Sequence, residues 1–419
     1  MRLLILGGGN AQLSAIKKAK KMGHTVIVSD YLKDAPGIEL ADHFELVSTF
    51  NIKENIKVGK KYNIDGVMTI GTDQPVLTAA AVAENLSLST LINSDTAKAV
   101  TNKKVMKKLF KENSIPTVKY RLIDEKKSKN KIEDIDFPAV LKPLDSQGQR
   151  GVFKVNSIEE INYYFENVLK YSRENQILLE EYYNSDEITV SGWVDEGTLH
   201  ILTITDRITY EQETNIGICT AHIFPSKYLN KYYKKIKSIS NKIINSFKIR
   251  SGPIYFQMLI GNKGIKVNEI ACRIGGAYEA DFMPLITNVD ILKMVINSSL
   301  GKKINKRALK KYNILKNINW LSVQLFFAEK GRIHKIKNVD LIRKFNEVVT
   351  IKINYKEGDS IPEIENATAR AGYFIVRGKN KQELKDNIKK VYDNLEILNS
   401  KNKNLILRKA GEIFPTTIS

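Results

Sequence analysis

The chain has 419 residues, of which 42% are hydrophobic and 27% are charged. A chain of this length is too long to form one compact core, so we expect about two to four domains. The formal net charge is +20, but the lysines fall on helix-like stretches without interleaved aromatic residues. We therefore expect a solvated basic surface and no nucleic-acid partner. The two cysteines, the lack of a leader-like segment and the lack of a long apolar run predict a cytoplasmic protein without disulfides or a membrane span.

The first hundred residues alternate strand-like and helix-like segments. The apolar run Arg2–Leu6 is followed by Gly7-Gly8-Gly9-Asn10, and a later strand at 66–70 ends at Gly71-Thr72-Asp73. This pattern predicts a parallel α/β domain whose strand-end loops line a crevice. A glycine turn before a helix can also bind a dinucleotide, but Gln12 stands where the third glycine of that motif would be, so we rank this reading lower.

Beyond residue 100 we expect a basic helix at 102–113, a polar loop at 124–136 and then alternating strands and helices. The expected strands are 138–141, 151–155, 176–182, 187–194, 199–205, 253–260, 265–270, 321–327, 348–353 and 372–376. The expected helices are 158–170, 227–247 and 381–394.

Lys142 ends the strand at 138–141 and precedes a loop that contains Ser146, Gly148 and Gly151. A lysine at this position buries its stem and presents its ammonium group. A loop with little to bury can close over phosphates with its backbone N–H groups. The alternative is an exposed lysine on a surface hairpin.

A second candidate stretch, Glu180-Glu181-Tyr182-Tyr183, lies where a strand leaves the core. Free backbone groups there can pair with an adenine edge, and the two tyrosines can wall the slot. Glu187 is placed to accept hydrogen bonds from ribose hydroxyls. The alternative is that these acidic residues are simply solvated.

A third candidate is the pair Gln257 and Glu269 on the two arms of a predicted hairpin. A three-residue loop at 262–264, with Gly264 left-handed, would set 261 opposite 265 and Gln257 opposite Glu269. Opposed residues share a face, so their oxygens could hold one Mg²⁺. A two-residue loop would instead place them on opposite faces. Arg273 follows four residues after Glu269 and precedes Gly275-Gly276, where the backbone can come close to a ligand.

Taken in chain order, these residues resemble the ATP-grasp superfamily. The order is Lys103, Lys142 with its loop, Glu180–Tyr183, Glu187, Gln257, Glu269 and Arg273. The stretch 369–378 resembles the small domain found beside biotin carboxylase and phosphoribosylglycinamide synthetase. The resemblance implies an α/β fold with a parallel α/β pre-ATP-grasp domain at 1–100, a two-lobed α+β ATP-grasp domain at 101–310 and a small α+β C-terminal domain at 311–419. A flexible lid lobe would span about residues 116–186.

The resemblance also implies an ATP-dependent carboxylate–amine ligase that forms an amide through an acyl phosphate and releases ADP and phosphate. Its partners would be a small carboxylate, such as an amino acid, and an amine, and a homodimer is left open. Lys103 and Lys142 would bind ATP together with the loop that contains Ser146, Gly148 and Gly151 and with the hinge, Glu180–Tyr183. Gln257 and Glu269 would hold Mg²⁺ or Mn²⁺. The implied catalytic residues are Arg273 and Lys142. The implied substrate-side residues are Gly9, Asn10, Asp73, Gly275 and Gly276.

The chain departs from the family pattern at two positions. The family usually has Glu where this chain has Gln257, and its usual second metal ligand, an Asn, is Ala271 here. Both changes weaken a second metal site. The alternatives are a bicarbonate-activating carboxylase and a non-catalytic protein that binds ATP or nucleic acid.

Overall fold

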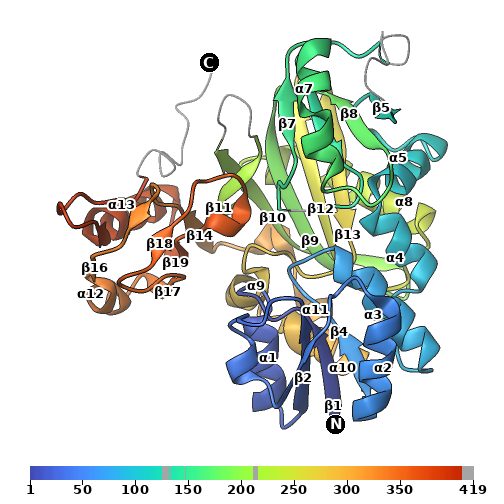
Figure 1. The fold of residues 1–419 in the computed structure, drawn as a ribbon, viewed down its shortest axis with the longest axis horizontal. Helices are drawn as coiled ribbons and strands as arrows, with labels where there is room; N and C mark the ends of the chain where they lie inside the picture. Colours follow the sequence, from blue (N-terminus) through green and yellow to red (C-terminus); the bar gives the residue numbers. More distant parts are fainter. Residues whose placement is uncertain (125–131, 133, 147, 211–215, 408–419) are drawn as a thin grey trace.

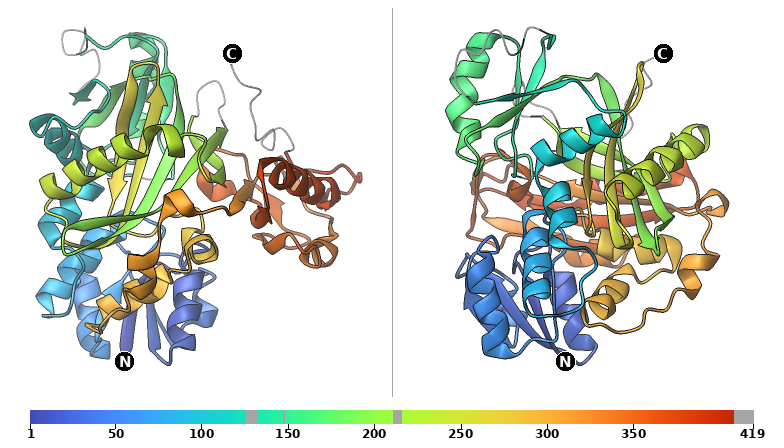
Figure 2. Two further views of the ribbon diagram at one scale, coloured as in Figure 1. Left: turned by 180° about the vertical axis from the view of Figure 1, so that it is seen from behind. Right: turned by 90° about the vertical axis from the view of Figure 1, so that its right-hand side faces the viewer.

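The computed structural model describes residues 1–124, 132, 134–146, 148–210 and 216–407. The N-terminal domain forms one end of the molecule and the lid lobe the other, while the C-terminal domain projects to one side (Figures 1 and 2). Among the described helices, none is both long and apolar enough to cross a membrane.

The N-terminal domain is a parallel sheet with helices on its faces, as the sequence predicts. Its strand order is β3-β2-β1-β4. The strands are β1 (Arg2–Leu6), β2 (Thr25–Asp30), β3 (His43–Leu46) and β4 (Gly66–Met68). The helices are α1 (Leu13–Lys21), the 3₁₀ turn η1 (Ile38–Leu40), α2 (Ile52–Tyr62), α3 (Gln74–Asn85) and α4 (Ser94–Thr101). Leu3 to Leu6 are fully buried, as expected for a parallel strand covered on both faces.

The lid lobe is a small antiparallel sheet in the order β5-β8-β6-β7, packed against one helix. The elements are β5 (Tyr120–Ile123), β6 (Ala139–Pro143), β7 (Phe153–Val155), α7 (Ile158–Leu169) and β8 (Ile177–Glu181). Helix α5 (Lys103–Glu112) leads into this lobe. Most of the polar loop expected at 124–136 lies outside the described residues.

An antiparallel sheet of eight strands forms the centre of the molecule, in the order β13-β12-β9-β10-β11-β14-β19-β17. Its first five strands are β9 (Ser185–Asp195), β10 (Thr198–Tyr210), β11 (Ile218–Phe224), β12 (Ser251–Gly261) and β13 (Gly264–Ala271). The sequence analysis missed β11 and expected β9 and β10 to be shorter. Helix α8 (Leu229–Ser246) packs its apolar side on the core of this sheet.

The C-terminal domain continues the same sheet. Strand β14 (Trp320–Phe326) pairs with β11, and β19 (Gly372–Gly378) and β17 (Val348–Ile353) follow it. The remaining elements are β15 (Gly331–Arg332), β16 (Lys335–Lys337), α12 (Val339–Arg343), β18 (Ser360–Ile361), η3 (Ala367–Ala369), α13 (Lys381–Asn394) and β20 (Glu396–Leu398). This domain therefore joins the central body through hydrogen-bonded strands.

The chain returns to the N-terminal domain before it enters the C-terminal domain. The intervening elements are α9 (Glu279–Thr287), α10 (Ile291–Ser299), α11 (Arg307–Lys311) and η2 (Ile314–Lys316). Helix α10 packs on α1 and β4. The fit is close, because a Cβ on Gly66 would lie 2.2 Å from the Ser299 carbonyl oxygen. One hydrophobic core thus runs from β1 through α9 and α10 to the central sheet.

Candidate active site

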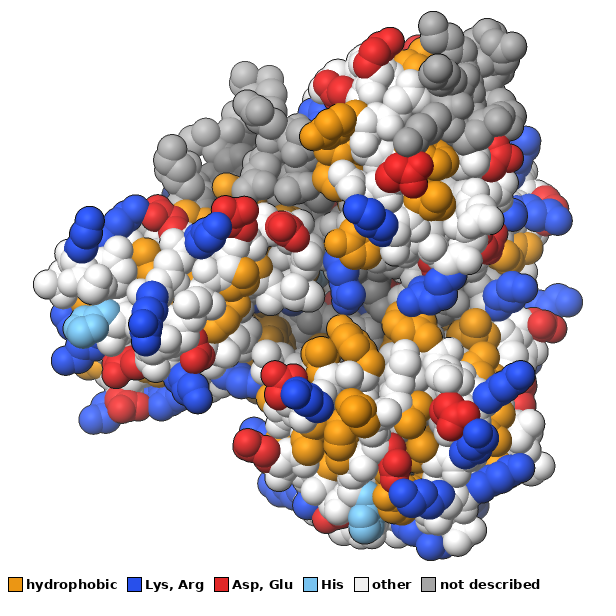
Figure 3. All heavy atoms as spheres, viewed as in Figure 1, with side chains coloured by type: hydrophobic (Ala, Val, Ile, Leu, Met, Phe, Trp, Pro, Cys, Tyr) orange, Lys and Arg blue, Asp and Glu red, His pale blue; other side chains and the backbone are white. Residues whose placement is uncertain are grey.

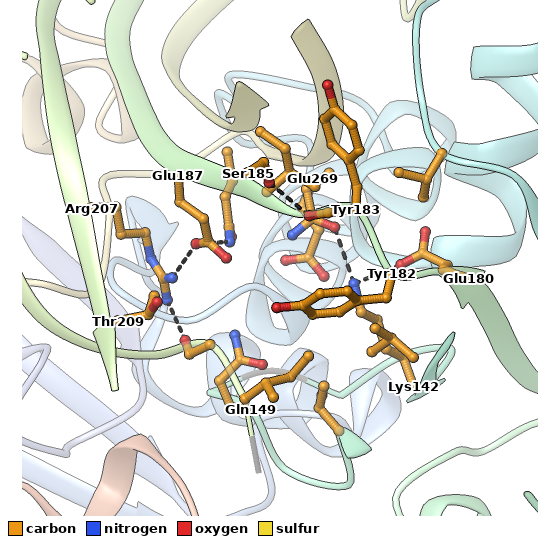
Figure 4. Close-up of a pocket in the computed structure, with 18 of the residues that line it drawn as sticks. Lys142, Gln149, Glu180, Tyr182, Tyr183, Ser185, Glu187, Arg207, Thr209 and Glu269 are labelled. Carbon is orange, nitrogen blue, oxygen red and sulfur yellow. Dashed lines mark hydrogen bonds and ion pairs between the residues drawn. The ribbon is translucent and has the colours of Figure 1, made fainter. Parts of the chain in front are cut away.

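A cavity of about 230 Å³ lies between the lid lobe and the central sheet (Figure 4). It brings together nearly all the residues predicted to bind ATP and metal. These are Lys103, Lys142, Ser146, Gly148, Glu180, Glu181, Tyr182, Tyr183, Glu187, Gln257 and Glu269. Gly151 does not line it. Gly151 has a φ of +69° and lets the loop pack on Tyr171, whose ring would lie 2.8 Å from a Cβ at this position.

A buried carboxylate lies between two lysines at one side of the cavity. Glu180 contacts Lys107 Nζ at 2.5 Å and Lys142 Nζ at 2.6 Å. Burial acts to raise the pKa of Glu180, but the two ammonium groups outweigh it and lower the pKa to about 2. Burial likewise opposes the charge on Lys142, but Glu180 and Glu269 raise its pKa above the usual value. Lys142 is thus held as a cation that faces the cavity.

A second lysine–carboxylate pair also lines the cavity. Lys103 Nζ is 3.0 Å from Glu269 Oε1 and donates to the Ser146 carbonyl oxygen at 2.8 Å. Burial acts to raise the pKa of Glu269, and the charges of Lys103 and Lys142 reverse this and lower it. Lys103 therefore connects α5 both to the loop that contains Ser146 and to the candidate metal ligand Glu269.

Gln257 and Glu269 are directly paired on β12 and β13, as predicted, but for a different reason. Gly264 has a positive φ of +88°, yet the strands close with Gly261 opposite Gly264, so the predicted 261–265 register was wrong. Met258 pairs with Val267 and Gln257 pairs with Glu269, which leaves Asn268 as a bulged extra residue. The bulge compensates for the shorter turn and restores Glu269 to the face that carries Gln257.

The residues on this face fit a magnesium ion held together with phosphates. The Glu269 carboxylate and the Gln257 amide are oxygen donors, and the Gln257 Nε2 donates to Glu187 at 2.8 Å, which leaves its oxygen for another partner. Mg²⁺ commonly binds through one or two protein oxygens plus substrate phosphates and water. The described residues contain no cluster of three or more His, Cys, Asp or Glu side chains that could hold a metal by themselves.

Glu187 is fixed by two partners at the far side of the cavity. Its Oε2 contacts Arg207 and accepts the hydrogen bond from Gln257. Arg207 also donates to the Gly217 carbonyl oxygen at 2.9 Å. The carboxylate is therefore oriented (Figure 4), and its Oε1, which has no hydrogen-bond partner among the described residues, can accept from a hydroxyl such as that of a ribose.

The two hinge tyrosines differ in direction. The Tyr182 ring lies across the cavity, and the Lys154 ammonium sits 4.1 Å from its centroid (Figure 4). The Tyr183 ring points away, and its hydroxyl donates to the Gly264 carbonyl oxygen at 2.9 Å. Tyr182 alone can supply an aromatic wall, while Tyr183 ties the hinge to the β12–β13 turn.

Arg273 lies just after β13, where the central sheet meets the N-terminal domain. Its NH2 is 2.6 Å from Asp73 Oδ1, and its guanidinium lies 4.9 Å from the Tyr255 ring centroid. Burial acts to lower the pKa of Arg273, but Asp73 reverses this and raises it. The backbones also touch, because Gly71 N donates to the Ile274 carbonyl oxygen at 3.0 Å. The predicted substrate-side residue Asp73 thus positions the predicted catalytic arginine.

The Gly275-Gly276 pair permits two close approaches. A Cβ on Gly276 would lie 2.4 Å from the Gly71 carbonyl oxygen. A Cβ on Gly275 would clash with the carboxylate of Glu279, which accepts hydrogen bonds from Gly275 N at 3.2 Å and Ser191 Oγ at 2.8 Å. Both glycines therefore serve protein contacts beside Arg273.

Gly9 and Asn10, expected to share one substrate crevice, face different spaces. Gly9 lines a cavity beneath the lid lobe, whereas Asn10 lines a cleft beside the C-terminal domain and accepts a hydrogen bond from Lys352 at 3.1 Å.

The geometry of the first glycine turn also argues against a dinucleotide site there. Gln12 Nε2 donates to the Ile70 carbonyl oxygen, and its side chain packs on Gly7. Asp30 is occupied by the backbone N–H groups of Gly8 and Leu32.

The sequence analysis did not single out Lys107, Asn268 and Arg207. Lys107 lies one helical turn after Lys103, so the i, i+4 spacing was a usable signal for a second lysine on the same helix face. Asn268 accepts a hydrogen bond from Lys142 Nζ at 3.1 Å only because of the bulge. Arg207 lies on β10, beyond residue 205, where the expected strand ended.

Comparisons with known proteins agree with this geometry. Residues 135–281 match the ATP-grasp domain family, and residues 324–399 match the L-amino acid ligase C-terminal domain 2 family. A formate-dependent phosphoribosylglycinamide formyltransferase of Prochlorococcus marinus (strain MIT 9515) is 24% identical over 316 residues, which is 74% of this chain and 79% of that protein. A phosphoribosylamine–glycine ligase of Thermococcus gammatolerans is 22% identical over 331 residues, 74% of this chain and 75% of that protein.

Solved structures show the same fold. An L-amino acid ligase from Bacillus licheniformis superposes with a TM-score of 0.78 at 17% identity, covering 94% of this chain and 98% of that one. A phosphoribosylglycinamide synthetase from Anaerococcus prevotii superposes with a TM-score of 0.74 at 20% identity, with the same coverage of the two chains. The matched regions and the shared fold agree: the chain contains an ATP-grasp domain over residues 135–281 and has the fold of ligases of that superfamily.

Proposed function

We propose that the protein joins a small carboxylic acid, most simply an amino acid, to an amine at the expense of ATP. The observation that carries this proposal is the convergence on one cavity of two phosphate-directed lysines, Lys103 and Lys142, with the oxygen donors Gln257 and Glu269. Arg273 follows Glu269 on the chain and lies against the N-terminal domain. This is the arrangement needed to move a phosphoryl group from ATP to an acid bound beyond Glu269.

In this proposal ATP lies along the cavity, with its base at the Glu181–Tyr183 backbone and Tyr182, its ribose at Glu187 and its phosphates at Lys103 and Lys142. Mg²⁺ bound by Gln257 and Glu269 would neutralise phosphate charge. Glu180 keeps Lys142 charged and in place, and Lys107 binds the other oxygen of the same carboxylate. The loop that contains Ser146 and Gly148 covers the phosphates and excludes water from the acyl phosphate.

The reaction takes place in two displacements. A carboxylate oxygen of the acid attacks the γ-phosphorus, the bond from that phosphorus to the ADP oxygen breaks, and an acyl phosphate forms. The amine nitrogen then attacks the acyl carbon, the bond to the phosphate oxygen breaks, and the amine gives up a proton as the amide forms. The Arg273 guanidinium, held by Asp73, would stabilise negative charge on the transferring group in both steps.

The experiment that tests this proposal is phosphate release from ATP with a panel of amino acids, small carboxylates and bicarbonate, each with and without added amines. The proposal predicts release that depends on an acid, and a hydroxamate of that acid when hydroxylamine replaces the amine. Release that responds to bicarbonate alone would indicate a carboxylase. Nucleotide binding without release under any condition would indicate a non-catalytic protein.

A further inference from the structure

A second cavity, of about 470 Å³, lies beneath the lid lobe. It is separate from the cavity between the lid lobe and the central sheet, which we call the nucleotide cavity. Its floor is formed by the loops at the carboxyl ends of the parallel strands, at Gly9, Tyr31–Leu32, 48–50 and Thr72. Its roof is formed by two parts of the lid lobe. These are the loop that contains Ser146 and Arg150 and the segment 170–173. Figure 3 shows the molecule hollowed between the lid lobe and the N-terminal domain, with hydrophobic side chains along the lower edge. We call this space the strand-end cavity.

The strand-end cavity adjoins the place where phosphate would be transferred. Ser146 and Arg150 line both this cavity and the nucleotide cavity. The Ser146 carbonyl oxygen is bound by Lys103, which also contacts Glu269. Thr72 and Gln74 flank Asp73, the partner of Arg273. A molecule in the strand-end cavity can therefore present one end to the phosphate-binding residues while its remainder stays outside the nucleotide cavity.

One cation faces the junction of the two cavities. Arg150 lines both cavities, and within the described part of the chain its Nε is buried without a hydrogen-bond partner. A buried guanidinium N–H that lacks a partner costs free energy unless a ligand satisfies it. A guanidinium also matches a carboxylate in shape and charge. Arg150 is thus suited to hold the carboxylate of an acid.

The outer part of the strand-end cavity is apolar. Tyr31, Leu32, Phe50 and Tyr171 all line it, and all are among the large hydrophobic side chains that remain exposed. The Phe50 ring is also covered on one side by Arg173, whose guanidinium lies 3.6 Å from the ring centroid. Arg173 is itself held by Asp145 at 2.9 Å. Several exposed apolar groups around one cavity indicate a surface that binds an apolar group.

The geometry points to the strand-end cavity as the site of the acid substrate, a carboxylate with a bulky apolar or aromatic side chain. Arg150 binds the carboxylate at the junction, and Tyr31, Leu32 and Phe50 contact the side chain. This assignment rests on the proposed ligase function for its chemistry. The position of the acid site and its selectivity are inferred from the residues that line the cavity. Both can be tested by binding experiments that need no turnover.

The test uses the full-length protein and a thiol placed at the edge of the cavity. Cys219 and Cys272 are buried, so Leu32→Cys introduces the accessible thiol among the described residues. Its labelling by a maleimide should slow at least about threefold with phenylalanine or leucine present at saturation, with or without ATP, and little with glycine. The matched control is Leu46→Cys, an exposed position on β3 outside the cavity, whose labelling should not change. Adding Arg150→Ala to Leu32→Cys should abolish the protection, and Arg150→Lys should retain part of it.

A second experiment measures kcat/KM with any acid that stimulates phosphate release. Phe50→Ala should lower kcat/KM about tenfold for apolar acids, equivalent to ~1.4 kcal/mol, and leave the ATP dissociation constant unchanged. Tyr163→Ala, an exposed tyrosine on α7 away from the cavity, should change neither value. If no acid in the panel protects the Leu32→Cys thiol, or if Phe50→Ala and Arg150→Ala leave every responsive acid unaffected, the inference is overturned. Protection without phosphate release would instead retain the site and contradict the ligase function.

Discussion

Gln257 and Glu269 face each other across β12 and β13 because Asn268 is an extra residue in the second strand. Without this bulge the two-residue turn at 262–263 would turn Glu269 to the opposite face of the hairpin. The same bulge brings the Asn268 amide oxygen to Lys142. A single inserted residue therefore links the candidate metal ligands to the candidate phosphate ligand.

The first prediction concerns Glu269. Glu269→Gln should lower Mg²⁺-dependent phosphate release by roughly 100-fold or more, because the strongest oxygen donor for the metal is lost. The melting temperature should change little, since Lys103 keeps its bond to the Ser146 carbonyl oxygen. Titration of Mg²⁺ at saturating ATP measures the effect. Unchanged Mg²⁺ dependence would remove Glu269 from the metal site.

The second prediction concerns Lys142. Lys142→Ala should raise the ATP dissociation constant by roughly 10- to 100-fold, because a charge-assisted contact to phosphate is lost. The fold should survive because Glu180 keeps Lys107 as a partner. Calorimetric titration with a non-hydrolysable ATP analogue measures this, with the exposed Lys108→Ala on α5 as the control. Equal affinities in the two variants would assign Lys142 a structural role only.

The third prediction concerns the pH dependence of stability through Glu180. The folded-state pKa of Glu180, about 2, lies below the ordinary value of 4.5, so its ionisation stabilises the fold above pH 4.5 and this contribution is lost as the pH falls towards 2. Glu180→Gln removes the carboxylate that Lys107 and Lys142 both contact and should lower the free energy of unfolding by about 3–5 kcal/mol at pH 7. The difference from the native protein should be about 2 kcal/mol smaller at pH 3.

Denaturant unfolding at the two pH values measures this difference. The control is Glu363→Gln, which removes an exposed partner of Lys330 and should shift stability by less than about 1 kcal/mol at either pH. A difference between the native protein and Glu180→Gln that is the same at pH 3 and pH 7 would contradict the assignment of the low pKa to Glu180.

The fourth prediction separates the arginine from the nucleotide site. Asp73→Asn keeps the size of the side chain but removes the charge that holds Arg273. We expect kcat/KM for the acid to fall by roughly tenfold to 100-fold, while the ATP dissociation constant stays within about twofold of the native value. Asn10→Ala, in the cleft beside Lys352, should leave kcat/KM for the acid nearer the native value. If Asp73→Asn weakens ATP binding instead, the arginine belongs to the nucleotide site.

The sequence predicted the parts of the fold that depend on local pattern. Apolar runs such as 3–6 and glycine turns such as 7–9 identify a parallel α/β domain because both signals lie within a few residues. Lys142, Glu180 and Glu187 were found for the same reason: each ends or begins a strand beside a break in the apolar pattern.

The features that were missed depend on contacts between distant segments. Strand β11 lies between β10 and β14 in the sheet, and β14 is about a hundred residues later in the chain. The bulge at Asn268 depends on how both arms pair, which a turn residue such as Lys263 does not determine. The separation of Gly9 from Asn10 into two cavities depends on where the lid lobe and the C-terminal domain dock. Periodicity along the chain contains no information on such docking.

The central claim, that the acid is activated by phosphorylation, is tested most directly by following its carboxylate oxygens. The native protein would turn over ATP, an amine and a responsive acid labelled with ¹⁸O in its carboxylate, and the released phosphate would be examined by mass spectrometry. An acyl phosphate predicts that one labelled oxygen passes from the acid to phosphate for each amide formed. Phosphate free of the label, with amide still produced, would contradict the account.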